Sequence, residues 1–379
     1  HSFCERIRID SEPIKPHKFA SLVEQLWPYQ QNVASKTSLG PISLFEFMTA
    51  MAFTCFNQSG VEFQTIEVGL GGRLDATNVV DPQAIIITPV SLDHTDILGN
   101  TLREIASEKS GVIKPGVPVI IAPQEPEALE VILSKCKDLN CLPVLLQRDI
   151  TWTLEERAPD HQSAIIHGRL ENYPVDIPLI GSYQLENAAC AIGALEIMIE
   201  KGYSITADAI SKGIGKVFWP CRMEVLSQVP LIVVDGAHNP ASIALLLESL
   251  PKYLDFDQIS LIVGFSRDKQ VSEMVDILSQ LKPRVYATNS RHPRSVPEGT
   301  LCNLFRRHGL KTINGFNDVK SAGEMAVKEA KNRDLILATG SLFVAAELRE
   351  SVLGITPEIY PDLLTKSAGR HDDQVPYGG

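Results

Sequence analysis

The stretch AIIITPVSLDHTDILGNTLREIASEKSGVIKPGVPVIIA, residues 84–122, decides the fold class. It contains two short runs rich in isoleucine and valine, at residues 84–90 and 117–122. Between them, apolar side chains recur at helical spacing in residues 100–111. A strand, a helix and a second strand in this order predict parallel strands joined by a crossover helix. The chain is therefore expected to have an α/β fold.

The same alternation extends in both directions from this stretch. Further strand-like runs are FQTIEV (63–68), LPVLL (142–146), PLIVV (230–234), ISLIVGF (259–265), PRVYATN (283–289) and DLILATGS (334–341). Residues 150–180 do not follow this alternation of strands and helices, and they predict an antiparallel patch. A long helix is then expected from Tyr183 to about Lys201. Periodicity stops within FWPCRMEVLSQ (218–228) and restarts as a new strand. We therefore expect one domain over residues 1–224 and a second over residues 225–379.

Composition narrows the class of protein. The 379 residues, 44% apolar and 21% charged, are typical of a soluble globular chain with two domains. A formal net charge of -11 argues against a general nucleic-acid partner or an anionic membrane surface. The seven cysteines lack zinc spacing, and no apolar run approaches the roughly 18 residues of a membrane helix. These features predict a cytoplasmic protein with reduced thiols, and we expect a monomer that acts on small molecules.

A candidate metal site follows from EVGLGGRLDATN (67–78) and the segment after residue 90. Glu67 and His94 each stand where a predicted strand has just ended, at the carboxyl edge where ligands bind in open α/β folds. A carboxylate with an imidazole can hold a divalent metal, and oxygen-rich surroundings favour magnesium. The next helix returns Lys109 to this edge, where a metal would favour its neutral amine and hence a carbamate. Taken alone, each residue is better explained as a surface acid, a turn histidine or an exposed lysine, and only their shared edge favours a metal site.

Two further motifs could contact a nucleotide. In DGAHNP (235–240), Asn239 and Pro240 suit an ordinary helix start, which leaves Asp235 and His238 as candidate ligands. In GSYQLENAACA (181–191), Gln184 and Asn187 share a helix face, although a plain polar face would look the same. Four basic residues could hold an anionic group such as a phosphate and are called candidate anion clamps: Arg222, Arg267, Lys269 and Arg291. No Gly-Lys-Ser/Thr phosphate loop occurs, and GIGKVF (213–218) is interpreted as a helix end.

Taken together, these motifs resemble folylpolyglutamate synthase and dihydrofolate synthase, within the Mur ligase superfamily. The matching blocks, in the family's order, are SFCERIRI, LFEFMTAMAF, EVGLGGRLDATN, SLDHTDILGNTLREIASEKSGVIK, GSYQLENAACA, DGAHNP and ATGSLF. The resemblance implies a Mur-ligase-like central ATPase domain followed by a Rossmann-like domain. It also implies ATP-dependent addition of L-glutamate to folate or dihydropteroate through an acyl phosphate, in one-carbon metabolism.

Carried over by position, the resemblance implies magnesium ligands at Glu67 and His94, with two magnesium ions expected. It implies a carbamylated lysine at Lys109, nucleotide contacts at Gln184 and Asn187, and a phosphate contact at Arg222. Asp235 and His238 are expected to contribute catalytically and to ATP and glutamate binding. The residues expected near the pterin and the active-site floor are Phe45, Glu46, Arg73 and Asp75.

The chain departs from the family pattern at two places. The family reads Pro-Gly-Arg where this chain has Pro220-Cys221-Arg222, so a Cβ is expected to displace the arginine slightly. The family's phosphate loop, with its strand and helix, does not precede SFCERIRI, so the residues as given are expected to bind ATP poorly and catalyse little. Two alternatives stay open: a loop-less, non-catalytic relative that binds folate or a partner, and another Mur-type amino-acid ligase.

Overall fold

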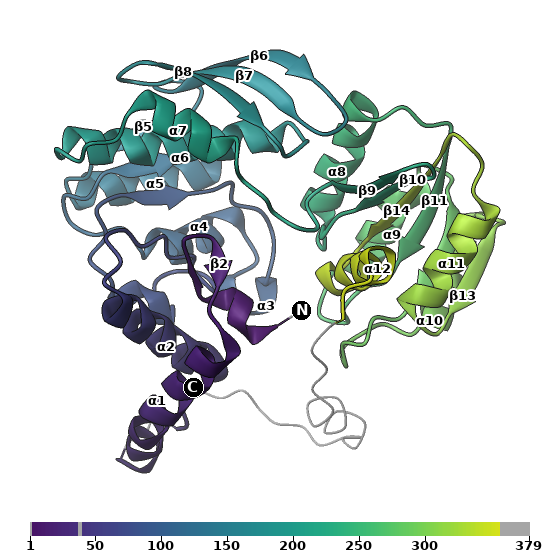
Figure 1. The fold of residues 1–379 in the computed structure, drawn as a ribbon, viewed down its shortest axis with the longest axis horizontal. Helices are drawn as coiled ribbons and strands as arrows, with labels where there is room; N and C mark the ends of the chain where they lie inside the picture. Colours follow the sequence, from purple (N-terminus) through teal and green to yellow (C-terminus); the bar gives the residue numbers. More distant parts are fainter. Residues whose placement is uncertain (1, 37–39, 357–379) are drawn as a thin grey trace. The chain divides into compact units, whose positions relative to one another are not determined.

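The structure is a computed structural model that describes residues 2–36 and 40–356 (Figure 1). The chain divides into two compact units, residues 1–144 and residues 145–379. No helix within the described residues combines the length and the apolar character that crossing a membrane requires. The tail segment TKSAGRHDDQVPYGG, expected to be frayed, lies outside the described residues.

The first unit combines a helical start with a small parallel sheet. Its elements are η1 (Phe3–Arg6), β1 (Arg8–Ile9), β2 (Glu12–Pro13), α1 (Pro16–Lys36), α2 (Leu44–Ser59), η2 (Ala76–Val79), β3 (Ile85–Ile87), α3 (Thr95–Leu98), α4 (Leu102–Ser110), β4 (Val119–Ile121), α5 (Pro126–Asp138) and β5 (Pro143–Leu145). The strands pair in the order β3-β4-β5, with β3 parallel to β4. The strand–helix–strand unit predicted over residues 84–122 is thus confirmed.

One predicted strand of this unit is wrong. Residues 63–68, FQTIEV, form no strand in the described part of the chain. An apolar, β-branched run becomes a strand only when a neighbour completes its ladder of hydrogen bonds, and β3 finds that neighbour in β4. Strand propensity alone therefore predicted one strand too many in this unit.

The second unit begins with an antiparallel meander and two helices. These elements are β6 (Thr151–Arg157), β7 (Gln162–His167), β8 (Asn172–Ile177), α6 (Tyr183–Glu200) and α7 (Ala207–Ile214). The strands pair in the order β6-β7-β8, which confirms the predicted antiparallel patch. The helix α6 buries Leu185, Ala188, Ala189 and Ile192, so its predicted length and apolar face are also confirmed. GIGKVF begins in the last turn of α7, as its interpretation as a helix end requires.

A buried carboxylate joins α6 to the turn between β7 and β8. Glu196 is fully buried and accepts hydrogen bonds from the backbone amides of Arg169 (3.0 Å) and Leu170 (2.8 Å) and from the Tyr173 hydroxyl (3.1 Å). The Glu196 carboxylate and the Tyr173 hydroxyl lie away from water, so each needs its hydrogen-bond partner inside the protein.

Replacing Glu196 with alanine is expected to lower the free energy of unfolding by about 2–4 kcal/mol, because the buried Tyr173 hydroxyl and two amides of the turn lose their acceptor. The matched control is Glu200→Ala, one helical turn later, which removes only a partly exposed ion pair with Arg169 and should change stability by about 0–1 kcal/mol. Urea unfolding monitored by circular dichroism measures both changes. Equal losses for the two variants would contradict the structural role of Glu196.

The rest of the second unit is an α/β sandwich. Its elements are β9 (Glu224–Gln228), β10 (Leu231–Val234), α8 (Pro240–Tyr253), β11 (Gln258–Val263), α9 (Val271–Ser279), β12 (Arg284–Thr288), α10 (Glu298–Arg307), β13 (Ile313–Phe316), α11 (Val319–Glu329), β14 (Asp334–Thr339) and α12 (Leu342–Leu353). The sheet order is β13-β12-β11-β14-β10-β9, parallel except for β9, which pairs antiparallel with β10 (Figure 1). The predicted strands are confirmed here, whereas β9 and β13 were missed because both are edge strands without a continuous apolar run.

Successive side chains of a central strand point to opposite faces of the sheet and pack into two different hydrophobic cores. In β14, Leu335 and Leu337 pack with α8, α9 and α10, whereas Ile336 and Ala338 pack with α11 and α12. A parallel sheet covered by helices on both faces must be apolar on both faces, which explains why these strands read as unbroken apolar runs. The ends of the strands remain the places where polar side chains can reach solvent.

Candidate functional site

In the first unit, the glycine-rich loop packs tightly on the end of α4. The backbone amide of Arg73 donates to the Glu108 carbonyl (3.0 Å), and the Arg73 guanidinium bonds the Glu108 carboxylate (3.0 Å). A Cβ at Gly72 would lie 2.8 Å from the Lys109 carbonyl oxygen and 2.9 Å from that of Glu108. Only glycine fits such an approach of two backbones. The EVGLGG motif therefore brings the chain that follows Glu67 against the turn that carries Lys109.

Lys109 lies half-buried on α4 beside the segment that carries His94. Burial lowers the pKa of the Lys109 amine, and the nearby Asp93 carboxylate opposes that shift. His94, the residue after Asp93, has a left-handed backbone (φ 51°) at the start of α3, and its side chain is 42% exposed. The chemistry that the sequence expected of Lys109, an amine readily made neutral, thus has a physical basis in its burial.

Of the predicted metal ligands, Glu67 offers a carboxylate and His94 an imidazole. Glu67 is exposed on the glycine-rich loop. Among residues 2–36 and 40–356, no three His, Cys, Asp or Glu side chains are grouped so that they could hold a metal ion. A carbamate on Lys109 would add an anionic oxygen donor to this set, so the fit of the site to magnesium depends on Lys109.

The residues expected at the active-site floor make local contacts. Asp75 accepts hydrogen bonds from the amides of Leu70 and Thr77 (2.9 Å each) and begins η2. Glu46 completes the capping box of α2 with Ser43, whose hydrogen bonds lower the pKa of the Glu46 carboxyl. The Phe45 ring sits over Gly69, where a Cβ would come within 2.3 Å of it. These contacts shape the loop and leave Phe45, 37% exposed, as its apolar surface.

In the second unit, the amides on α6 form a pair. The Asn187 side chain donates to Gln184 Oε1 (2.9 Å), and Gln184 is buried while Asn187 is exposed. The shared face expected from the spacing is therefore present. The pairing fixes the Gln184 oxygen as an acceptor and leaves its amide group as the donor.

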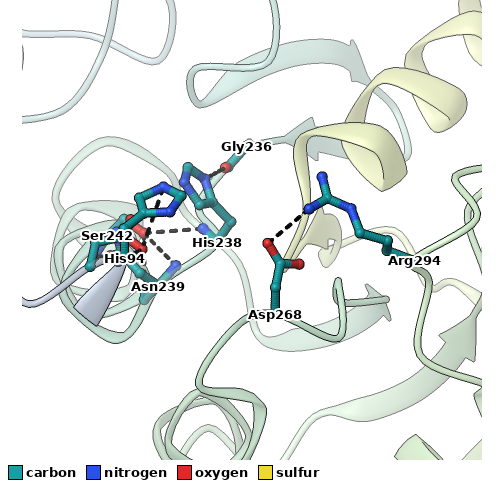
Figure 2. Close-up of polar contacts among 8 residues, drawn as sticks. His94, Gly236, His238, Asn239, Ser242, Asp268 and Arg294 are labelled. Atoms are coloured by element: carbon teal, nitrogen blue, oxygen red, sulfur yellow. Dashed lines mark hydrogen bonds and ion pairs between the residues drawn. The ribbon is translucent and has the colours of Figure 1, made fainter. Parts of the chain in front are cut away.

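The DGAHNP segment begins α8 and turns sharply after β10. His238 Nδ1 donates to the Gly236 carbonyl (2.8 Å), while the amides of His238 and Asn239 donate to Ser242 Oγ (3.1 Å each) (Figure 2). Asn239 caps α8, as the capping interpretation expected. The bond to Gly236 places a proton on Nδ1 and orients the imidazole ring.

Asp235 is buried beneath this turn, 3% exposed. Its two carboxylate oxygens accept hydrogen bonds from the amides of Met223 and Ala237, both at 2.8 Å. Burial raises the pKa of the Asp235 carboxyl, and these hydrogen bonds together with Arg222 and His238 oppose the shift. Asp235 therefore joins the turn before β9 to the end of β10.

The candidate anion clamps differ in their surroundings. Arg222 is exposed, whereas Arg291 is ion-paired with Glu347 (3.6 Å) and with Glu350. Burial raises the pKa of Glu347 to about 7. Three residues further along the same loop, Arg294 pairs with Asp268 (3.3 Å), as Figure 2 shows. Arg222 is thus better placed than Arg291 to meet an incoming anion.

Sequence reasoning missed three residues around Arg222. Burial raises the pKa of the Tyr183 hydroxyl, the nearby Asp235 carboxylate raises it further, and the Arg222 guanidinium opposes the shift. Glu224 accepts from the Cys221 amide (2.9 Å) and is paired with Arg349 (2.9 Å). A tyrosine in GSYQ and an acid two residues after Arg222 were the available signals, and neither indicates a partner without the fold.

Comparisons with known proteins identify the family of both parts of the chain. Residues 30–195 match the family model described as Mur ligase middle domain, and residues 221–342 match that described as Mur ligase, glutamate ligase domain. A dihydrofolate synthase/folylpolyglutamate synthase of Bacillus subtilis is 31% identical, covering 92% of this chain and 81% of the relative. A probable bifunctional folylpolyglutamate synthase/dihydropteroate synthase of Halobacterium salinarum is 32% identical, covering 91% of this chain but only 42% of the relative's length. A solved folylpolyglutamate synthase of Mycobacterium tuberculosis, complexed with ADP and AMPPCP, superimposes with a TM-score of 0.86 at 28% identity, over 94% of this chain and 83% of that one.

The fold and these matches define an ATP-dependent amino-acid ligase of the Mur type. Within that class, the chain belongs to the folylpolyglutamate synthase/dihydrofolate synthase family. The fold class and the family expected from the sequence are thereby confirmed.

Proposed function

We propose that the full-length protein adds L-glutamate to a reduced folate, to dihydropteroate, or to both, at the expense of ATP. The observation that carries the proposal is that relatedness to folylpolyglutamate and dihydrofolate synthases runs through both halves of the chain. A carboxylate of the folate or pteroate takes the γ-phosphoryl group of ATP, which releases ADP. The glutamate amine then attacks the acyl carbon, forms the amide and releases phosphate and a proton.

In the first unit, we propose that Glu67, His94 and a carbamate on Lys109 hold magnesium, which when bound neutralises phosphate charge. The half-buried amine of Lys109 and its lowered pKa support this role. Phe45 offers an apolar surface to a pterin ring. The capping and loop contacts of Glu46, Arg73 and Asp75 support a role in the floor of this site.

In the second unit, we propose that Gln184 and Asn187 contact the nucleotide base or ribose, and that Arg222 contacts a phosphate. His238, with its ring oriented by Gly236, is proposed to act on the glutamate or ATP side. We further propose residues 1–224 and 225–379 as the functional domains. The start of β9 at Glu224 and the family model that begins at residue 221 support that boundary, although compactness alone divides the chain after residue 144.

The test is an assay of the full-length protein with ATP, magnesium and isotopically labelled L-glutamate. Dihydropteroate, tetrahydrofolate and a UDP-linked sugar peptide serve as alternative acceptors. We expect label and ADP in equal amounts with a pteridine acceptor and neither with the UDP-linked one. Transfer only to the UDP-linked acceptor would support another Mur-type ligase. Pteridine binding in a thermal-shift series without any ADP release would support a non-catalytic relative.

A further inference from the structure

The first unit has a groove between α4 and α5, away from the candidate metal ligands. Its volume is about 320 Å³, at the lower end of the roughly 300–1,000 Å³ typical of small-molecule sites. On α4 the groove is lined by Arg103, Ser107 and Ser110, which recur at a spacing of four and three and so share one helix face. Lys109 lies on a different face of the same helix, because residues one or two positions apart do not face the same way. The groove is therefore distinct from the candidate metal site.

Two arginines of the groove already have an acidic partner. Arg103 on α4 is ion-paired with Glu130 on α5 at 2.5 Å, which joins the two helices towards their N-termini. Arg73, from the glycine-rich loop, donates through Nε (3.1 Å) and Nη2 (3.0 Å) to a single oxygen of Glu108. Its third nitrogen, Nη1, makes no hydrogen bond with any residue that the structure describes. A guanidinium engaged on one edge only can still accept a second carboxylate.

The other polar side chains of the groove have no such partner. Lys135 is half-buried and Asp138 is exposed, both near the end of α5, and within residues 2–36 and 40–356 neither makes an ion pair. The hydroxyls of Ser107 and Ser134, which line the groove from the two helices, also bond to none of the described residues. The groove thus offers an ammonium, a carboxylate and two hydroxyls to a ligand, in addition to the open edge of Arg73.

The sign of the charges narrows the class of ligand. Three cationic and two anionic side chains line the groove, a net charge of +1: Arg73, Arg103, Lys135, Glu130 and Asp138. A phosphate ion or a dicarboxylate would satisfy the cations but would bring Asp138 a like charge. A neutral amino acid would satisfy Asp138 but would leave one cation unmatched. An acidic α-amino acid, with two carboxylates and one ammonium, carries the complementary charges and a net charge of -1.

We propose that this groove binds an acidic α-amino acid of the L-glutamate class at a site separate from the catalytic centre. Lys135 and Arg73 hold its two carboxylates, and Asp138 holds its ammonium group. The bound ligand ties the glycine-rich loop to α5. That loop already packs on the end of α4, since a Cβ on Gly111 would come within 2.3 Å of the Arg73 Cβ. Occupancy of the groove therefore stabilises the loop that leads back to Glu67.

Hydrogen exchange of the full-length protein, with and without millimolar L-glutamate, tests the site. We expect L-glutamate to slow amide exchange in residues 70–73 and 134–139. Unchanged exchange in both segments would overturn the proposal. Slower exchange confined to the second unit would also overturn it, while leaving the proposed function intact. Slower exchange in the groove of a protein that has no ligase activity would contradict the proposed function and not this site.

Substitutions on α5 distinguish the groove from other glutamate sites. Lys135→Gln and Asp138→Asn are each expected to raise the concentration of L-glutamate needed for this slowing by about tenfold, the scale of one hydrogen bond between charged groups. Both positions are at least partly exposed, so the fold is expected to persist. The matched control is Lys137→Gln, exposed on α5 outside the groove, which should respond like the unmodified protein. An unchanged response of Lys135→Gln or of Asp138→Asn would overturn the proposal, as would an equal loss in the control.

Two analogues test the class of ligand. Glutarate lacks the ammonium group and L-glutamine lacks the second carboxylate, so both are expected to slow exchange in the groove less than L-glutamate does at the same concentration. In Asp138→Asn the advantage of L-glutamate over glutarate should disappear, because the carboxylate that selects the ammonium is gone. If glutarate and L-glutamate act equally on the unmodified protein, the groove does not recognise an amino acid and the proposal is wrong.

Discussion

Replacing Lys109 with glutamine is expected to lower the ligase rate of the full-length protein by about 10²–10³-fold, the scale seen when a group that stabilises transition-state charge is lost. The amine lies half-buried beside Asp93, and burial lowers its pKa, so a neutral amine is accessible. A neutral amine can add to carbon dioxide, forming a C–N bond and releasing a proton, which leaves an anionic oxygen ligand for magnesium. Steady-state ADP release measures the loss.

Lys109→Arg separates this role from that of a simple cation. Arginine keeps the positive charge but does not lose its proton, so it cannot form the carbamate. We expect Lys109→Arg to be as slow as Lys109→Gln, and removal of dissolved carbon dioxide to slow the unmodified enzyme only. The matched control is Lys137→Gln, an exposed lysine on α5, which should keep full activity. Substantial activity in Lys109→Arg would refute the carbamate and leave a cationic role.

Replacing Gly72 with alanine is expected to destabilise the first unit by about 1–3 kcal/mol, the usual cost of overpacking. The new Cβ would lie 2.8 Å from the Lys109 carbonyl oxygen and 2.9 Å from that of Glu108. Both are backbone atoms at the end of α4, so the loop must move instead. Because that loop continues back to Glu67, ligase activity should fall together with the midpoint of thermal unfolding.

The matched control for this change is Gly213→Ala. Gly213 lies in the last turn of α7, and a Cβ there would meet no atom within 4 Å. Alanine at a helical glycine is expected to stabilise by about 0.5–1 kcal/mol. If Gly72→Ala melts like Gly213→Ala and remains fully active, the loop is not held against α4 as the structure shows.

Much of the fold was predictable because its signals are local. The apolar runs that became β10, β11, β12 and β14 are buried on both faces, so their composition alone identifies them. The helix α6 carries its apolar face at regular spacing, and DGAHNP carries its own capping residue in Asn239. The strand predicted at residues 63–68 is wrong because its signal is not sufficient locally. A strand also depends on a neighbouring strand, which the local sequence does not reveal.

The order of short motifs along the chain was enough to determine the family and the types of side chain available for chemistry. The tertiary structure alone decided how those side chains are used. It occupies both oxygens of Asp235 with backbone amides, pairs Arg291 with Glu347 and the buried Glu350, and leaves Arg222 exposed on a strained turn. The physical reason is that a motif specifies donors, acceptors and charges, whereas burial and long-range hydrogen bonds decide which of them remain accessible to a substrate.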